Sequence, residues 1–501
     1  MTAPLPRAYP SVVHMLAAAA EAAPEAEALA EGETRLTYRE YVTCVAAFAS
    51  ELAALGVRGE RVATILPNSI DACVAAFGIL AAGAQHVPLN PLYTTRELGE
   101  ILSDAKPRVL VVAEEPAAAR AALIVLGPRT RSLVDFRQSE ASLEQFPDPD
   151  ALALLQYTGG TSGRAKGVNL SHRSIATNVA QREGLLPTET GERILCAMQL
   201  FHAYAMAMGL FLAADCRGCL VVLSRYQPET LLEAIVRERI TIFPGSPTIF
   251  AGLMAHPRFA DTDWSRVHTC YSGAAPLAEQ VLQRWEAAVG APILEGYGQT
   301  EAGPVLSFNP RNGIRKPGSV GIPAAATEIQ IVDVETGTRV LPAGERGEIR
   351  ASGPQIMLGY RNLPRETSEA LRAGWLYTGD IGEFDADGYL YIRDRKKDMV
   401  IVGGYNVYPR EIEDVLFTHP AVMEAAAVGA PDSYKGEIVR AYVALKPQAQ
   451  ASEEELLAHC RVNLAKYKIP ATIELLKAIP KTAVNKTDKQ ALRRRASGGG
   501  L

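Results

Sequence analysis

The 501-residue chain lacks a strong excess of charge of either sign and lacks a long uninterrupted hydrophobic run. Its 51 basic and 56 acidic residues give a formal net charge of -5, so no global field attracts nucleic acid or anionic lipid. No stretch of about 18 successive apolar residues is present, which excludes a membrane-spanning helix. Any anion site must be built locally, and we expect neither nucleic acid nor a membrane span among the interactions.

Cysteines are few, and their spacing matches no disulfide framework. There are seven, an odd number scattered along the chain, which is typical of a reducing cytoplasm. Cys216 and Cys219 lack the second pair or the histidines that a redox or metal site needs, so we interpret them as buried structural thiols. The alanine-rich N-terminal stretch has no basic n-region and is interrupted by Glu21 and Glu25. We expect a helix there rather than a signal peptide, and a cytoplasmic protein.

Hydrophobic periodicity predicts an α/β protein. Helices are expected at residues 10–23, 38–55, 69–82, from 95, 228–238 and 278–289, and strands at 61–66, 86–89, 108–112, 193–198, 219–223, 240–243, 268–272 and 292–295. This alternation favours two helix-wrapped, mainly parallel sheets. Thr37 and Glu40 fit a capping box at the start of the second helix. Residues 114–150 are rich in Ala, Pro and charge, so we expect a surface connection there.

The pattern changes in the C-terminal part of the chain. Residues 328–333 and 347–350 alternate between apolar and polar, which predicts a small antiparallel barrel or sheet. A charge run at residues 393–398 then precedes a new α+β pattern of small-domain size. We place a hinge there, between an N-terminal domain of residues 1–395 and a mobile C-terminal domain of residues 396–501. The tail, residues 493–501, is expected to fray.

A glycine-rich loop joins two predicted strands, residues 151–157 and 167–170, and reads Thr158-Gly159-Gly160-Thr161-Ser162-Gly163-Arg164-Ala165-Lys166-Gly167. The glycines let backbone N–H groups face an anion, the hydroxyls donate further hydrogen bonds, and the lysine neutralises charge. A flexible linker would need neither the flanking strands nor the fixed lysine. Walker A spacing is absent, and a strand, not a helix, follows; Ser171 can cap the next helix. We predict a phosphate-binding loop of another kind.

Five further motifs follow the loop in a fixed order. They are Leu200-Phe201-His202-Ala203-Tyr204, Ser272-Gly273-Ala274-Ala275-Pro276-Leu277, Gly296-Tyr297-Gly298-Gln299-Thr300-Glu301, Tyr377-Thr378-Gly379-Asp380 and Pro480-Lys481-Thr482-Ala483-Val484-Asn485-Lys486. Together the motifs resemble the adenylate-forming superfamily of acyl-CoA synthetases, adenylation domains and luciferases over nearly the whole chain. The second and third are similar to those of 4-coumarate-like and medium-chain or aryl acyl-CoA ligases. The resemblance implies that ATP, Mg²⁺ and coenzyme A are used to convert a carboxylic acid to its thioester through acyl-AMP.

The resemblance assigns the charged and hydroxyl residues to adenylation. The β and γ phosphates would be held by Thr158, Gly159, Gly160, Ser162, Gly163 and Lys166, and Mg²⁺ by Thr161 and Glu301. Lys486 would reach the substrate carboxylate and the α-phosphate, where local positive charge offsets the repulsion between two anions. In isolation, Glu301 would be interpreted as a helix-capping acid.

The same resemblance places the adenosine part of the nucleotide. Adenine would be bound by Ala274, Ala275, Gly296 and Tyr297, with Gly298 and Thr300 beside it. Asp380 would accept hydrogen bonds from the ribose hydroxyls, with Arg395 assisting, because a carboxylate offers acceptors to two donors at once. Without the resemblance, Asp380 would be interpreted as a turn residue after Gly379.

For thioester formation, the resemblance implies rotation of the C-terminal domain. Lys397 aligns with the pivot, and Gly403 and Gly404 align with the glycines beside which pantetheine passes. Two positions depart from the common pattern: Ala165 stands where proline is usual, and Asn485 where glycine is usual before the lysine. Neither change removes a reacting group.

Substrate choice would lie with an acyl pocket lined by His202, Ala203, Tyr204, Ala207, Tyr271, Gly273, Pro304 and Val305. A lone histidine beside phenylalanine is more often a core residue, so the role of His202 rests on the resemblance alone. Ala207 and Tyr271 stand where plant 4-coumarate ligases carry polar residues, so a substrate phenol would lose partners. We expect an apolar medium-chain or simple aryl acid. Malonate is disfavoured, because Gly296 stands where malonyl-CoA synthetases carry arginine.

Two other functions are considered beside the CoA ligase. An acyl-AMP ligase that loads a carrier protein is opposed by Gly404 and by the absence of an appended carrier domain in this sequence. A nucleotide-binding protein without catalysis is opposed by the retention of Lys166, Glu301, Asp380 and Lys486. The sequence leaves the oligomeric state open between monomer and homodimer.

Overall fold

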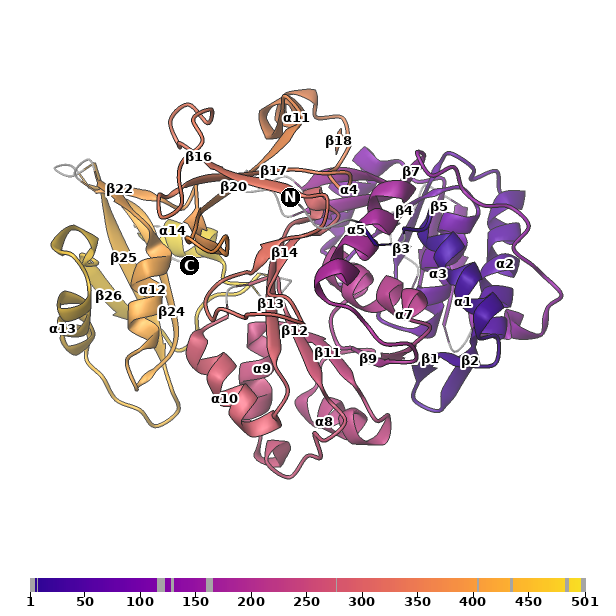
Figure 1. The fold of residues 1–501 in the computed structure, drawn as a ribbon, viewed down its shortest axis with the longest axis horizontal. Helices are drawn as coiled ribbons and strands as arrows, with labels where there is room; N and C mark the ends of the chain where they lie inside the picture. The colour runs from indigo at the N-terminus through magenta and orange to yellow at the C-terminus, as the bar shows by residue number, and fades with distance from the viewer. Residues whose placement is uncertain are drawn as a thin grey trace. The chain divides into compact units, whose positions relative to one another are not determined.

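A computed structural model describes residues 5–6, 8–114, 122–127, 130–158, 165–275, 277–402, 405–432, 436–482 and 486–496 (Figure 1). Its internal contacts divide the chain into two units. The first comprises Met1–Ile329 and Ala351–Tyr377, and the second comprises Gln330–Arg350 and Thr378–Leu501. Each unit contains its own clusters of buried hydrophobic residues.

A seven-stranded sheet in the first unit carries the glycine-rich loop. Its strand order is β18-β8-β7-β4-β3-β5-β6. The bounds are β3 Arg61–Ile65, β4 Gln85–Pro88, β5 Val109–Val112, β6 Ala122–Val125, β7 Leu152–Thr158, β8 Lys166–Ser171 and β18 Gly359–Tyr360. Strands β7, β4, β3, β5 and β6 are parallel, whereas β8 and β18 add antiparallel at one edge. The expected parallel core is confirmed, with an antiparallel edge where the loop lies.

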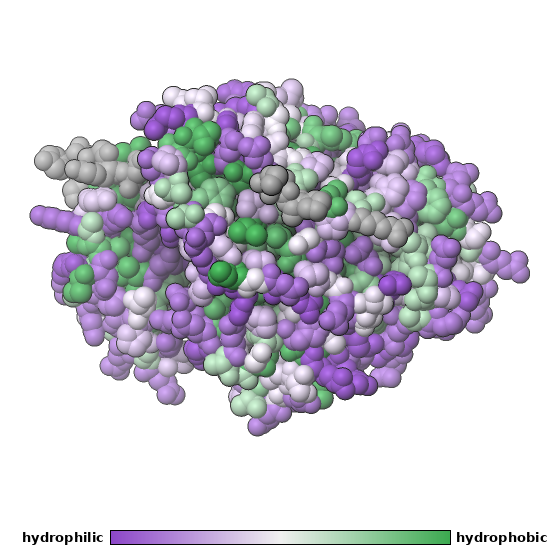
Figure 2. Space-filling view, in the orientation of Figure 1, coloured by the Kyte–Doolittle hydropathy of each residue, from purple (hydrophilic) through white to green (hydrophobic). Residues whose placement is uncertain are grey.

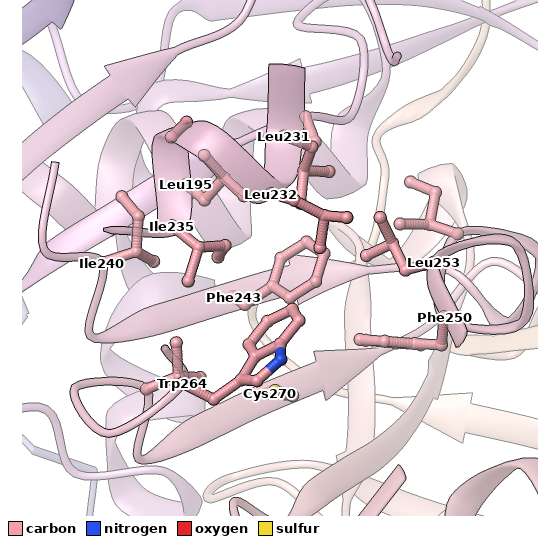
Figure 3. Packing of buried hydrophobic residues seen from close by; sticks show 14 of the residues in the cluster. Leu195, Leu231, Leu232, Ile235, Ile240, Phe243, Phe250, Leu253, Trp264 and Cys270 are labelled. Carbon is pink, nitrogen blue, oxygen red and sulfur yellow. The ribbon is translucent and has the colours of Figure 1, made fainter. Parts of the chain in front are cut away.

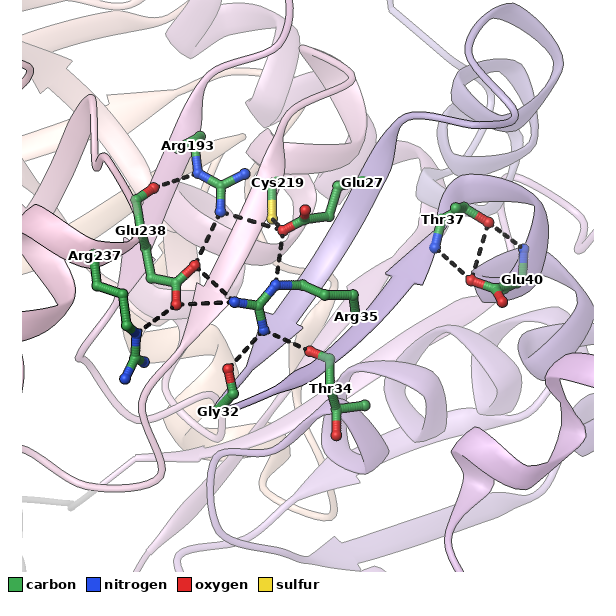
Figure 4. Close-up of polar contacts among 10 residues, drawn as sticks. All are labelled: Glu27, Gly32, Thr34, Arg35, Thr37, Glu40, Arg193, Cys219, Arg237 and Glu238. Carbon is green, nitrogen blue, oxygen red and sulfur yellow. Dashed lines mark hydrogen bonds and ion pairs between the residues drawn. The ribbon is translucent and has the colours of Figure 1, made fainter.

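Helices connect these strands. Their bounds are α1 Val12–Ala22, α2 Tyr38–Ala54, α3 Ile70–Ala81, α4 Thr95–Ala105, α5 His172–Leu185 and α11 Pro364–Ala370, with a 3₁₀ turn η1 Leu133–Gln138. The Thr37 side chain accepts from Glu40 N and the Glu40 carboxylate accepts from Thr37 N, which confirms the predicted capping box (Figure 4). Ser171 caps α5 as predicted.

A nine-stranded sheet forms the rest of the first unit. Its order is β15-β14-β13-β12-β11-β9-β10-β1-β2. The bounds are β1 Glu27–Glu31, β2 Thr34–Thr37, β9 Arg193–Cys196, β10 Cys219–Val222, β11 Ile242–Gly245, β12 Thr269–Ser272, β13 Ile293–Gly298, β14 Val305–Phe308 and β15 Ile322–Pro323. Strands β13 to β1 in this order are parallel, and β2, β14 and β15 are antiparallel to their neighbours. Two mainly parallel sheets are therefore present, as predicted.

Three helices pack on one face of the nine-stranded sheet: α8 Pro228–Arg237, α9 Pro247–Met254 and α10 Glu279–Val289. Their apolar side chains join those of β9, β11 and β12 in a buried cluster, in which Leu231, Leu232 and Ile235 of α8 lie over Phe243 of β11 (Figure 3). The Phe250 ring lies 4.7 Å from Trp285 between ring centroids. Buried aromatic pairs of this kind bury large apolar areas and fix the helices on the sheet.

An ion-pair cluster attaches the β1–β2 hairpin to the edge of this sheet (Figure 4). The Arg35 guanidinium on β2 donates to both carboxylate oxygens of Glu238, at 3.0 Å each, and pairs with Glu27 on β1 at 3.3 Å. Arg193 on β9 pairs with the same two carboxylates at 3.2 Å. Glu238 is buried, so its negative charge needs these cationic partners.

The second unit has a sheet of order β23-β22-β25-β24, with β26 parallel to β25. The bounds are β22 Val400–Val402, β23 Tyr405–Val407, β24 Val422–Asp432, β25 Gly436–Leu445 and β26 Thr472–Leu475, with helices α12 Pro409–Phe417, α13 Glu453–Asn463 and α14 Lys489–Ala496. Apolar residues of α12 and α13 pack on one side of the sheet, and those of α14 join a separate cluster. The predicted α+β pattern is confirmed.

A second antiparallel sheet has the order β16-β17-β20-β19, with β21 beside β20. Its strands are β16 Glu328–Val332, β17 Gly347–Ser352, β19 Leu371–Arg372, β20 Trp375–Phe384 and β21 Leu390–Arg395. The division between the two units runs along the chain within β16, β17 and β20. The hinge expected near Lys397 cannot be tested by one conformation and stays a prediction, as do the domain limits at residues 395 and 396.

Two expectations about elements were wrong. Residues 114–150 contain β6, which pairs with β5 as a buried edge strand, because its short Ala-Leu-Ile-Val run is apolar enough to extend the sheet. The tail does not fray over residues 493–496, which belong to α14. There, Arg493 pairs with Asp398 and Arg495 with Glu474, so the arginines are held by carboxylates of the same unit.

The seven cysteines are all free and buried, as the sequence predicts. Burial raises the pKa of the Cys216 thiol to about 12, so it is protonated and inert. Hydrophilic side chains predominate on the face shown in Figure 2, and hydrophobic ones form small patches. Among the described residues, no helix combines the length and the apolar character needed to cross a membrane.

His172, the first residue of α5, is expected to make stability depend on pH. The residue is fully buried, and among the described residues neither ring nitrogen has a hydrogen-bond partner. Burial lowers the pKa of His172 from 6.5 to about 4, so the unfolded state binds the proton more readily. Stability should therefore fall as pH drops from 6.5 towards 4, by about 3 kcal/mol for a shift of about two and a half pKa units.

Urea unfolding of a His172→Leu variant at several pH values tests this expectation. The dependence of the unfolding free energy on pH should be shallower between pH 6.5 and 4 than in the wild type. A His256→Leu variant, which removes a half-exposed histidine, serves as the control. Identical pH dependence in the wild type and the His172 variant would contradict the burial of a neutral imidazole.

Candidate active site

The predicted phosphate loop connects β7 and β8. The two strands pair antiparallel as far as Thr158 and Lys166. A Cβ on Gly167 would lie 2.8 Å from Leu155 Cδ1 and 3.1 Å from Tyr157 Cζ, so only glycine lets β8 lie this close to β7. Five predicted phosphate-binding residues lie outside the described residues: Gly159, Gly160, Thr161, Ser162 and Gly163. The described strands nevertheless fix where the loop begins and ends.

Lys166 and Glu301 are brought to the same aromatic side chain, that of Tyr360. The Lys166 Nζ lies 4.9 Å from the centroid of the Tyr360 ring, and the Tyr360 hydroxyl donates to Glu301 Oε1 at 2.9 Å. Tyr360 is held opposite Val168 because β18 pairs with β8. Burial, and then the Glu301 carboxylate, raise the pKa of Tyr360, so the phenol stays protonated and donates.

Sequence reasoning missed Tyr360. Strand β18 has two residues, too few to show any hydrophobic period. The only local signal was a Gly-Tyr pair shortly before Pro364, which starts α11. Its partners are distant in sequence, so neither hydrogen bond nor ring contact could be anticipated from spacing.

Glu301 lies in a 3₁₀ turn, η4 Thr300–Ala302, directly after β13. Its backbone oxygen accepts from Met357 N at 2.9 Å, which fixes the turn. Gly296, Tyr297 and Gly298 form the end of β13 and are partly or fully exposed. The structure therefore presents the predicted adenine-binding strand end and the predicted Mg²⁺ carboxylate on consecutive elements.

The loop after β12 has an unusual backbone. Ala274 has φ of 68°, a left-handed conformation that costs a non-glycine residue energy and often occurs at functional sites. A Cβ on Gly273 would lie 2.6 Å from Tyr204 Cε2, so the Tyr204 ring packs directly on this glycine. Ala274 and Ala275 are exposed beside them. Two predicted acyl-pocket residues are thus in contact, and the predicted adenine-binding alanines adjoin them.

The remaining predicted pocket residues lie on neighbouring elements. Ala203 and Tyr204 belong to α6 Ala203–Ala205, and Ala207 to the π-helix η2 Met206–Phe211, which continues into α7 Leu212–Asp215. Such π-turns are frequent at functional sites. His202 caps α6, because its Nδ1 accepts from Tyr204 N at 3.3 Å. Val305 starts β14, directly after Pro304, and Asn178 of α5 donates to Val305 O and accepts from Val305 N.

The second unit pairs Asp380 with Arg395. The two residues are opposite each other on β20 and β21, and Arg395 Nε lies 3.0 Å from Asp380 Oδ1. Asp380 is buried, whereas Arg395 is exposed. The Thr378 hydroxyl donates to Ile349 O and accepts from Asp380 N, which fixes the turn before the carboxylate. The predicted ribose-binding pair is therefore assembled within one unit.

The predicted catalytic lysine, Lys486, and the predicted pivot, Lys397, share the electrostatic environment of Arg395. The pKa of Lys486 is lowered by desolvation and by Arg395, with Asp380 opposing. The pKa of Lys397 is also lowered, by desolvation and then by Arg395. Both residues are exposed. Gly403 and Gly404, the predicted pantetheine-path residues, lie outside the described residues.

Comparison with protein-family models gives two matches. Residues 16–361 match the model described as "AMP-binding enzyme", and residues 411–486 match "AMP-binding enzyme C-terminal domain". Among characterised relatives, a long-chain-fatty-acid–CoA ligase of Bacillus subtilis (strain 168) is 37% identical over 513 residues, covering 94% of this chain and 91% of the relative. A feruloyl-CoA synthase of Amycolatopsis sp. is 37% identical over 482 residues, covering 95% and 97%.

Solved structures are similar over almost the whole chain. ATP-bound MatB from Rhodopseudomonas palustris superposes with a TM-score of 0.90 at 31% identity, covering 96% of this chain and 98% of that one. An anthranilate CoA ligase in complex with anthranoyl-AMP gives a TM-score of 0.89 at 28% identity, covering 99% and 98%. The chain therefore belongs to the AMP-binding enzyme family and is an AMP-forming acid–thiol ligase.

Proposed function

We propose that this enzyme converts a medium-chain aliphatic or aryl carboxylic acid to its acyl-CoA thioester through an acyl-AMP intermediate. The observation that carries the proposal is the contact of Tyr360 with both Lys166, at the end of the phosphate loop, and Glu301. It brings a cation and a hard oxygen ligand to one place, as a site for a metal-bound triphosphate requires. The relatives named as fatty-acid and feruloyl ligases are consistent with both acid classes.

In the first half-reaction, an oxygen of the substrate carboxylate attacks the α-phosphorus of ATP, and pyrophosphate leaves with the electrons of the broken P–O bond. Lys166 and the loop would hold the departing β and γ phosphates. Glu301 and Thr161 would bind Mg²⁺, which supplies charge neutralisation when bound. The geometry fits this assignment, since the half-buried Glu301 carboxylate is oriented by the Tyr360 hydroxyl.

No group of three or more His, Cys, Asp or Glu side chains in the described ranges forms a metal site of its own. One carboxylate together with substrate phosphates and water is the usual way in which proteins hold Mg²⁺ at a nucleotide. Glu301 is therefore sufficient as the described protein ligand.

Residues of the second unit would complete adenylation and then thioester formation. Asp380 and Arg395 would bind the ribose, and Lys486 would neutralise the carboxylate and the α-phosphate. In the second half-reaction the CoA thiolate attacks the acyl carbonyl, and AMP leaves. A rotation about Lys397 would remove Lys486 and bring Gly403 and Gly404 beside pantetheine. An acyl-AMP ligase that loads a carrier protein is the second candidate, because it shares the first half-reaction.

The first measurement is AMP release from ATP with aliphatic and aryl acids, each with and without CoA. We expect turnover that requires CoA and yields a thioester, with malonate among the poorest acids. Pyrophosphate exchange without CoA-dependent turnover would instead support the carrier-protein function.

Lys486 should separate the two half-reactions. A Lys486→Ala variant should lose acyl-adenylate formation, because the charge that offsets anion repulsion is gone, yet keep thioester formation from supplied acyl-AMP. Lys481→Ala is a matched control, since Lys481 pairs with Glu424 at 2.7 Å instead. Equal loss of both half-reactions in Lys486→Ala would refute the two-conformation assignment.

Tyr360 should act through Glu301. A Tyr360→Phe variant keeps the ring that faces Lys166 but removes the hydrogen bond to a charged acceptor, worth about 1.5 to 3 kcal/mol. We expect adenylation to slow by about tenfold to a hundredfold and the half-saturating Mg²⁺ concentration to rise. Tyr157→Phe, which removes a hydroxyl bonded to Asp104, is the control. An unchanged Mg²⁺ dependence in Tyr360→Phe would show that Tyr360 does not position Glu301.

A further inference from the structure

Three buried side chains of the first unit carry hydrogen-bond donors that the structure leaves unused. Among the described residues, no partner is present for the hydroxyls of Tyr204 and Tyr271 or for Nε and Nη2 of Arg182. The exposed fractions are 7% for Tyr204, 0% for Tyr271 and 1% for Arg182. Each residue is therefore more than nine-tenths buried, and a buried donor without an acceptor is unfavourable.

The three side chains belong to one neighbourhood. The Arg182 Cζ lies 4.9 Å from the centroid of the Tyr271 ring. Tyr204 packs on Gly273, two residues after Tyr271. Burial raises the pKa of Tyr204; the neighbouring Tyr271 raises it further, and Arg182 opposes the rise. The Tyr204 phenol accordingly remains a protonated donor, and the Tyr271 ring lies against the guanidinium.

The unused part of Arg182 is one edge of the guanidinium. The other nitrogen, Nη1, pairs with Glu183 and donates to Thr188 Oγ1 at 3.0 Å and Leu186 O at 3.4 Å. The edge formed by Nε and Nη2 is the one that binds a carboxylate or a pair of oxygen acceptors side-on. Because Glu183 already balances the charge, a neutral oxygen is as acceptable as an anionic one.

Two buried side chains of α5 beside Arg182 do have partners. Asn178, one turn earlier on α5, both donates to and accepts from the Val305 backbone. Gln181, next to Arg182, donates to Ala325 O at 2.9 Å and to Gln355 Oε1 at 2.9 Å. The amides of Asn178 and Gln181 are thus satisfied. The unused donors of Arg182 and the two tyrosines need an acceptor that these neighbours do not supply.

We infer that Tyr204, Tyr271 and Arg182 form a donor cluster that binds an oxygen atom at the far end of the acid substrate. The inference rests on the proposed function, in which Tyr204, Tyr271 and Gly273 line the acyl pocket. It narrows the substrate class to medium-chain or aryl acids with a hydroxyl, carbonyl or carboxylate oxygen remote from the reacting carboxylate. The expectation of a wholly apolar acid treated Tyr271 as a lost partner, whereas its hydroxyl is available.

Matched acids test the inference. AMP release with CoA is measured for octanoate, ω-hydroxyoctanoate and suberate, and for benzoate, para-hydroxybenzoate and terephthalate. In at least one series, kcat/KM for an oxygen-bearing acid should exceed that of its apolar counterpart by about tenfold or more. The hydroxyl and dicarboxylate arms distinguish a neutral from an anionic distal group.

Substitutions test whether the donor cluster causes the preference for oxygen-bearing acids. Tyr271→Phe and Tyr204→Phe should reduce the ratio of kcat/KM between oxygen-bearing and apolar acids by about tenfold. Arg182→Leu should reduce it most for the dicarboxylates, with thermal unfolding used to check that the variant folds. Tyr226→Phe is the matched control, because the Tyr226 hydroxyl is also buried and has no partner among the described residues but lies outside the cluster.

The outcomes distinguish failure of the inference from failure of the proposed function. Activation of octanoate and benzoate as good as that of their oxygen-bearing counterparts would overturn the inference and leave the ligase function intact. A preference for oxygen that Tyr271→Phe and Tyr204→Phe leave unchanged would also overturn it. Absence of AMP release with every acid would overturn the proposed function and the inference together.

Discussion

The pairing of β8 with β7 on one side and β18 on the other is the contact on which the candidate active site depends. On one side it places Lys166 opposite Thr158, at the end of the glycine-rich loop. On the other it places Tyr360 opposite Val168, where the phenol reaches Glu301 and the ring faces Lys166. A cation and a carboxylate are thus brought to the same aromatic side chain, where both would be available to the triphosphate of the proposed reaction.

The sequence alone was sufficient for most of the fold. Buried strands such as Val109–Val112 and capped helices such as Tyr38–Ala54 carry strong local signals, and both formed where expected. Strand β6 was missed because four apolar residues among alanines and prolines resemble a loop until a neighbouring strand pairs with them. The expectation that the tail frays was wrong for a similar reason. Its arginines look solvated in sequence, but their carboxylate partners, Asp398 and Glu474, are distant along the chain.

The residues of the candidate site also divide into those with a local sequence signal and those without one. Lys166 belongs to the glycine-rich loop, whose pattern singled it out, whereas Glu301 and Asp380 were singled out by the resemblance of their contiguous motifs to a known family. Tyr360 and Arg182 could not be found this way, because each matters through contacts with residues far away in sequence. Spacing reports which residue types occur together locally, whereas unused donors and ring contacts exist only after the chain has folded.

The second unit shows how one set of charges could serve two reactions. Arg395 pairs with the buried Asp380, which fixes the guanidinium. Desolvation is the larger cause of the lowered pKa of Lys397 and Lys486, and the Arg395 guanidinium lowers it further. A cation held in this way repels both lysines, and a bound phosphate or carboxylate would relieve that repulsion. An anion bound beside Lys486 would therefore be stabilised, as the proposed adenylation step requires. The charges of Asp380 and Arg395 would thus support Lys486 in the role proposed for it in adenylation.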